Sequence, residues 1–116
     1  MDWNTSENKR LIQAILALRS TSEAQRFLRD LLTPKEIKEF AKRLQTAEML
    51  SDKVSYVDIE KKTGLSSTTV ARVSKWLNGK EGGYRTIIAR LRVAKARSGV
   101  AEARLHHHPT ALARGG

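Results

Sequence analysis

A group of small polar and basic residues between positions 66 and 75 has the side-chain chemistry needed to contact bases and phosphates. Its members are Ser66, Ser67, Thr68, Ala71, Arg72 and Lys75. Hydroxyl groups can bond to bases or phosphates, an alanine methyl can touch a thymine methyl, and arginine or lysine can bind guanine or phosphate. Because helical residues advance by ~100° each, Thr68, Ala71, Arg72 and Lys75 share one arc of a helix. This arc is predicted to enter the major groove of duplex DNA.

The segment 55–78 contains the helices that would position this arc. A first helix is expected from Tyr56 to Thr63 after an N-cap at Ser55, and Gly64 is expected to form a tight left-handed turn. Ser66 is expected to cap a second helix that ends at Asn78-Gly79. Together these elements predict a helix-turn-helix over residues 55–78, in which the second helix reads bases.

Apolar residues at helical spacing are expected to hold the two helices together. They are Ile59, Leu65, Val70, Val73 and Leu77. The first helix would lie across the DNA backbone, with Tyr56, Lys61 and Lys62 near phosphates. The alternative is an ordinary helical hairpin in a core, whose polar residues are merely solvated.

The remaining sequence predicts an all-α fold, because its apolar residues recur at helical spacing and two-residue alternation is absent. Four further helices are expected over about 6–18, 23–31, 34–50 and 84–97. The third of these would begin with a capping box, in which Thr33 is the N-cap and Glu36 completes the box. Residues 1–97 are expected to form one helical domain. Residues 98–116 are expected to be a basic, mostly disordered tail, with extension of the last helix to about Leu105 as the alternative.

The charge of the chain is unevenly distributed. The net charge is +10, and residues 1–64 carry 12 basic and 10 acidic side chains, whereas residues 65–116 carry 10 basic and 2 acidic ones. This asymmetry favours a polyanionic partner, with nucleic acid first and an acidic membrane surface second; a well-solvated surface is the alternative. The basic run that follows the predicted recognition helix could track phosphates. It comprises Arg85, Arg90, Arg92, Lys95, Arg97 and Arg104.

Several classes of protein and site are disfavoured. No cysteine is present, which excludes disulfides and thiolate chemistry. No apolar run reaches the ~20 residues of a membrane span, and the polar N-terminus is unlike a secretory signal, so a cytoplasmic protein is expected. The run His106–His108 is interpreted as a solvated tail, because adjacent helical residues cannot all face one metal ion. The acidic residues lack a partner base, so no enzyme is predicted.

Three segments together resemble the Trp-repressor-like family, and most closely its YerC/YecD-type branch. These are FLRDLLTPKEIKEFAKRL, the helix-turn-helix, and LNGKEGGYRTIIARL, within residues 10–92. The resemblance implies a six-helix Trp-repressor-like fold, an intertwined homodimer, and an operator with twofold symmetry. It also implies repression, or less often activation, of transcription initiation. A basic helical module that binds an acidic protein remains the alternative function.

The resemblance also raises the question of an L-tryptophan-like corepressor. Residues that match the tryptophan-binding set of the family are Thr33, Arg43, Thr69 and Arg72. Two positions depart from it, because Val73 replaces a glycine and Trp76 replaces a serine that helps to hold the amino group. These larger side chains could fill the ligand cavity. Ligand-free DNA binding is therefore favoured over an amino-acid-responsive repressor, and no cofactor is expected.

Overall fold

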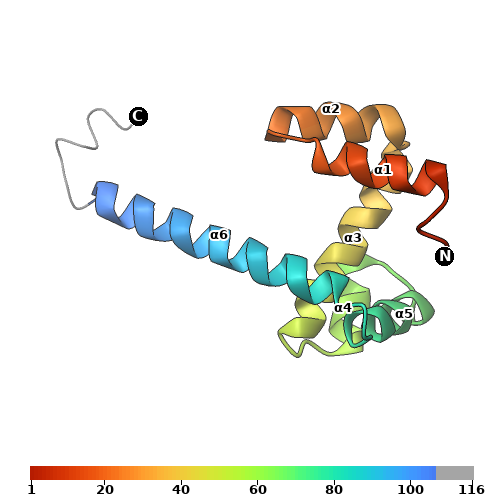
Figure 1. Cartoon of the computed structure of the whole chain (residues 1–116). Coiled ribbons are helices and arrows are strands. Elements are labelled where there is room, and N and C mark those ends of the chain that lie inside the picture. Colours follow the sequence, from red (N-terminus) through yellow and green to blue (C-terminus); the bar gives the residue numbers. More distant parts are fainter. Residues whose placement is uncertain (107–116) are drawn as a thin grey trace. The chain divides into compact units, whose positions relative to one another are not determined.

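The computed structural model describes the backbone of residues 1–106 and the side chains of residues 1–99. This part of the chain consists of helices without strands (Figure 1), as the sequence predicted. The six helices are α1 (Ser6–Leu16), α2 (Thr21–Leu31), α3 (Pro34–Ser51), α4 (Tyr56–Thr63), α5 (Ser67–Leu77) and α6 (Gly83–His106). Two compact units are present, Met1–Ala41 and a second that begins at Lys42, so the boundary falls within α3.

Hydroxyl side chains begin most of the helices. Thr5, Ser20, Ser55 and Ser66 each accept a hydrogen bond from a backbone N–H in the first turn that follows. The predicted capping box of α3 is confirmed, because the Glu36 carboxylate accepts from the Thr33 N–H at 3.0 Å and Thr33 Oγ1 accepts from the Glu36 N–H at 3.1 Å. These caps satisfy N–H groups that lack a partner within the helix.

Three predicted helix ends differ from the observed ones. Helix α2 begins at Thr21 rather than at Glu23, because Ser20 caps the helix instead of interrupting it. Helix α1 ends at Leu16 rather than near Leu18. Helix α6 continues to His106, past the predicted end at Arg97, which matches the longer alternative. Alanine, arginine and leucine favour helix strongly, and that preference does not require an apolar stripe.

The first unit contains α1, α2 and the beginning of α3. Neither α1 nor α2 contains a fully buried residue. Several apolar residues of these two helices stay substantially exposed, with Leu16 at 79%, Ile15 at 47% and Leu31 at 50%. Two helices of 11 residues each cannot enclose their own apolar faces within one chain.

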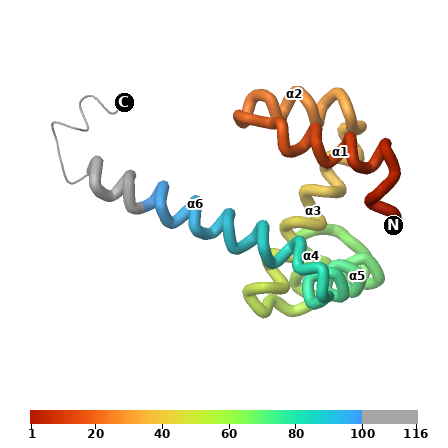
Figure 2. Tube along the Cα trace, in the orientation of Figure 1, coloured from red at the N-terminus to blue at the C-terminus, as the bar shows by residue number. Residues whose placement is uncertain are grey.

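The second unit contains the core that positions the helix-turn-helix. Its central cluster consists of Ala47 from α3, Val73 and Leu77 from α5, and Ile88 from α6. Leu44, Leu50 and Tyr84 are partly buried against this cluster. Figure 2 shows α4 and α5 side by side, close to the start of α6. Helix α5 is thus supported along one face by α4 and by the beginning of α6.

Candidate nucleic-acid interface

The turn between α4 and α5 depends on a residue in the left-handed region. Gly64 has φ 75° and ψ 4°, and its N–H bonds to the Glu60 carbonyl at 2.8 Å. A Cβ atom built at Gly64 would meet no atom within 4 Å, so the backbone conformation is what favours glycine here. The Thr63 side chain also stabilises the turn, because its Oγ1 donates a hydrogen bond to the Ile59 carbonyl and accepts one from the Leu65 N–H.

Apolar contacts fix α5 against α4 and the core. Ile59 and Val70 are completely buried, and Val73 and Leu77 are 3% and 6% exposed. Leu65 is half-buried. The core residues predicted for the helix-turn-helix are therefore inward-facing, and the opposite face of α5 is directed away from this core.

The start of α5 is rigidly held. Ser66 Oγ accepts from the Thr69 N–H at 3.2 Å and lies 3.0 Å from the Thr69 hydroxyl. An N-terminal turn fixed in this way keeps its backbone N–H groups pointed outward, where the helix dipole favours phosphate.

Every residue predicted to contact DNA from the second helix is exposed. These are Ser66, Ser67, Thr68, Ala71, Arg72 and Lys75. On α4, Lys61 and Lys62 are exposed, and Tyr56 is 42% exposed. The structure therefore leaves the hydroxyl, methyl and cationic groups at the start and along the outer arc of α5 accessible. We call Ser66, the N-cap of α5, and the five α5 residues of this set the recognition face.

Arg85 holds the end of α5, a role that the sequence did not reveal. Its guanidinium donates to the Leu77 carbonyl, one of the last carbonyls of the helix. The nearby Gly82 has φ 72°, and a Cβ there would lie 3.2 Å from the Arg85 guanidinium. The sequence predicts only that Arg85 belongs to the basic run that could track phosphates, because a contact with a residue eight positions away does not follow from helical periodicity.

Comparison with known proteins agrees with this geometry. The family model described as Trp repressor protein matches residues 6–92, which contain all of the recognition face. The chain belongs to the Trp repressor family. It is 36% identical over 92 residues to the protein YerC of Bacillus subtilis (strain 168), and the match covers 79% of this chain and 88% of YerC.

A solved structure supports the same placement within the Trp repressor family. The TrpR-like protein from Eubacterium eligens ATCC 27750 superposes with a TM-score of 0.71 at 39% sequence identity. The match covers 77% of this chain and 92% of that chain. The six-helix, all-α fold predicted from the sequence is therefore confirmed, together with the resemblance to the YerC-type branch.

The four residues that the resemblance matches to the tryptophan-binding set differ in burial and in the helix to which they belong. Thr69 and Arg72 lie one turn apart on α5; Arg72 is exposed and Thr69 is half-buried. Arg43 is half-buried on α3 within the second unit, whereas Thr33 precedes α3 in the first unit. The hydroxyls of Thr33 and Thr69 are both engaged in helix caps.

The two substituted positions of that site also differ in their environment. Val73, at the position where the resemblance implies a glycine, packs in the buried cluster with Ala47, Leu77 and Ile88. Trp76, at the position where the resemblance implies a serine, is 58% exposed. Val73 therefore fills core volume that a glycine would leave open.

Within residues 1–99, no group of three or more histidine, cysteine or acidic side chains could hold a metal ion. The side chains of the predicted His106–His108 run lie outside the described residues. No helix in the described part of the chain is long and apolar enough to cross a membrane.

Proposed function

We propose that this chain is a sequence-specific, double-stranded-DNA-binding transcriptional regulator that acts as a homodimer and represses transcription initiation. The observation that carries the proposal is the recognition face, which is exposed along α5 and follows the left-handed turn at Gly64. A helix presented in this way can place its N-terminal residues against base edges in the major groove. A regulator of this kind acts on chromosomal DNA, so we place it in the cytoplasm.

Exposed apolar residues support the homodimer. The chain leaves Leu16, Leu31, Phe40, Ile87 and Leu91 between 44% and 79% exposed. These residues lie on four different helices, and the single chain leaves their apolar side chains accessible to solvent. A second copy could bury them, and large apolar areas of this kind are typical of obligate dimers. Two recognition faces related by a twofold axis would then contact half-sites about one helical turn apart.

We propose that DNA binding does not require a free amino acid. The support comes from Val73, because its side chain belongs to the core cluster instead of leaving the gap of a glycine. The threonine hydroxyls at positions 33 and 69 already have partners in the chain. A corepressor would have to compete with these contacts or use the hydroxyls' remaining capacity.

The test begins with selection of bound duplexes from a random pool, with and without free amino acids. The selected duplex is then titrated with the double variant Arg72→Ala/Lys75→Ala. The matched control is Lys35→Ala/Lys38→Ala, which removes two exposed basic residues at the same spacing from α3. Loss of a specific base contact costs about 1–3 kcal/mol, so the first variant should bind at least about tenfold more weakly.

The control variant should keep most of the affinity for the selected duplex. Equal binding by wild-type protein and Arg72→Ala/Lys75→Ala would remove the recognition face from the proposal. If the protein is retained on heparin but its affinity for duplex DNA does not fall steeply with salt concentration, an acidic protein partner is favoured instead.

A further inference from the structure

Most of the excess charge of the chain lies outside the helix-turn-helix. Residues 83–116 contain seven basic residues and one acidic residue, and thus account for +6 of the total net charge of +10. Between residues 83 and 99, where side chains are described, α6 has five basic residues and no acidic one. The family match ends at residue 92, whereas α6 continues to His106. The proposed base-reading role therefore does not account for this charge.

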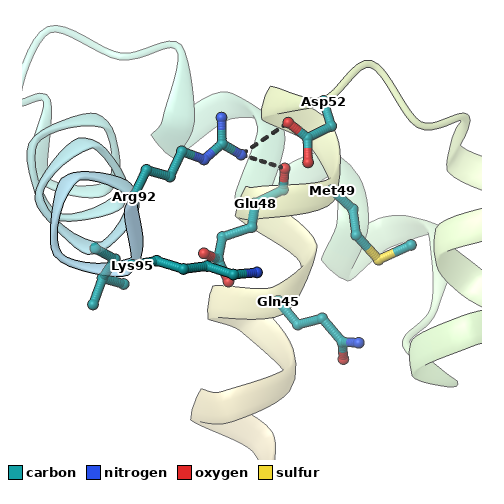
Figure 3. Close-up of a pocket in the computed structure, with 7 residues that line it drawn as sticks. Gln45, Glu48, Met49, Asp52, Arg92 and Lys95 are labelled. Carbon is teal, nitrogen blue, oxygen red and sulfur yellow. Dashed lines mark hydrogen bonds and ion pairs between the residues drawn. The ribbon is translucent and has the colours of Figure 1, made fainter. Parts of the chain in front are cut away.

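One face of α6 is turned toward α3 within the second unit. Figure 3 shows Arg92 reaching from α6 to Asp52, with an ion pair at 2.9 Å, and to the Glu48 carbonyl at 3.5 Å. Lys95 also extends toward α3 in this view. These residues line a cavity of about 470 Å³, together with Leu91. The charges on this face are therefore partly neutralised by α3.

The opposite face of α6 has a different composition. Arg90 and Arg97 line a shallow hollow of about 330 Å³ together with Ala89, Val93 and Ala94. All residues from 89 to 99 are exposed. Two arginines seven residues apart lie on the same side of a helix, about 10.5 Å apart along its axis. We call this surface the α6 arginine face.

We propose that the α6 arginine face is a second DNA-contacting surface, which binds the phosphate backbone of duplex DNA without regard to sequence. Arginine pairs with phosphate through a planar fork of donors and remains charged at any physiological pH. Because α6 has no acidic residue up to Gly99, nothing on the same helix segment competes for Arg90 and Arg97. Only the choice of DNA as the polyanion rests on the proposed function.

A duplex fits this surface better than an acidic protein does. Protein interfaces depend on large buried anchors such as tryptophan, tyrosine or leucine near their centre. Between its arginines this face offers only Ala89, Val93 and Ala94. Phosphate contacts need no apolar anchor, because the release of counterions from DNA supplies their driving force.

The test measures binding to a random-sequence duplex at several salt concentrations, by fluorescence anisotropy. The variant Arg90→Gln/Arg97→Gln removes both charges and keeps helix propensity, because glutamine and arginine are similar in that respect. The matched control Arg26→Gln/Arg29→Gln removes two exposed arginines from α2 and changes the net charge equally. Circular dichroism checks that both variants remain helical.

Each phosphate contact contributes about 0.9 to the slope of log affinity against log salt. The α6 variant should therefore lose up to about 1.8 in slope per chain, on random and selected duplexes alike. The α2 control should stay close to wild type. A slope for the α6 variant equal to that of wild type, or to that of the control, would overturn the proposal.

Both double variants are also made in the Arg72→Ala/Lys75→Ala background. The full set of variants distinguishes a failure of this proposal from a failure of the proposed function. If the wild type shows no sequence preference but the α6 variant still lowers the slope, base reading by α5 fails and the phosphate contact stands. If sequence preference is present and the slope does not change with the α6 variant, only the second surface fails.

Discussion

Substitution of Gly64 by alanine gives a prediction whose magnitude follows from the turn geometry. The residue has φ 75° and ψ 4°, and an added Cβ would contact nothing within 4 Å. Steric collision with neighbouring residues therefore contributes nothing, and the cost is that of a left-handed backbone for an L-residue, about 1–2 kcal/mol. In a domain of this size that corresponds to a decrease in Tm of about 4–8 °C.

Thermal unfolding followed by circular dichroism measures this decrease. Protein concentration must be held fixed, because the Tm of the proposed homodimer would depend on it. Gly64→Asn should lose less than Gly64→Ala, since asparagine tolerates the left-handed region better. Gly99→Ala is the matched control, because this glycine lies within α6, has no positive φ and also leaves space for a Cβ.

The control variant should show an unchanged or higher Tm, because alanine favours helix over glycine. If Gly64→Ala unfolded at the same temperature as wild type, or if Gly64→Asn were the less stable variant, the account of the turn would be refuted.

The remaining predictions concern a helix cap, a carboxylate and the ligand question. Ser66→Ala should cost about 1 kcal/mol in chemical denaturation, because Ser66 caps α5; a loss below a few tenths would contradict this role. Hydrogen bonds from the Thr33 backbone and hydroxyl groups lower the pKa of Glu36 from its ordinary value of 4.5. The carboxylate thus stabilises the fold above about pH 4.5 and loses this effect as the pH falls further, so the Tm difference between wild type and Glu36→Gln should shrink in acid. Calorimetric titration with L-tryptophan should give no heat at micromolar concentrations, and a micromolar Kd would restore an amino-acid corepressor.

Local sequence signals were sufficient to locate the helix-turn-helix. Ser55, Gly64 and Ser66 determine its caps and its turn through contacts of three or four residues, which sequence spacing makes visible. The inward positions Val70, Val73 and Leu77 follow from helical periodicity alone. The exposure of the recognition face could be predicted for the same reason, since all of its members but Ser66 lie in α5 away from these inward positions.

Contacts between distant residues were not visible in the sequence. Arg85 and Leu77 are joined across a loop, and Arg92 and Asp52 are separated by 40 positions. Periodicity also identifies apolar residues at helical spacing without showing what covers them, and Ile15, Leu31 and Phe40 are between 46% and 50% exposed in the single chain. The extended α6 was underestimated because its apolar stripe weakens after Leu91, whereas helix propensity does not.

Methylation interference on a selected duplex tests most directly whether the recognition face of α5 reads the major groove. Methyl groups at guanine N7 block the major groove, whereas those at adenine N3 block the minor groove. The expected result is interference at guanine N7 in two symmetric patches about 10–10.5 base pairs apart, weakened at defined positions by Arg72→Ala. Interference confined to adenine N3, or a selection that enriches no sequence, would contradict the account.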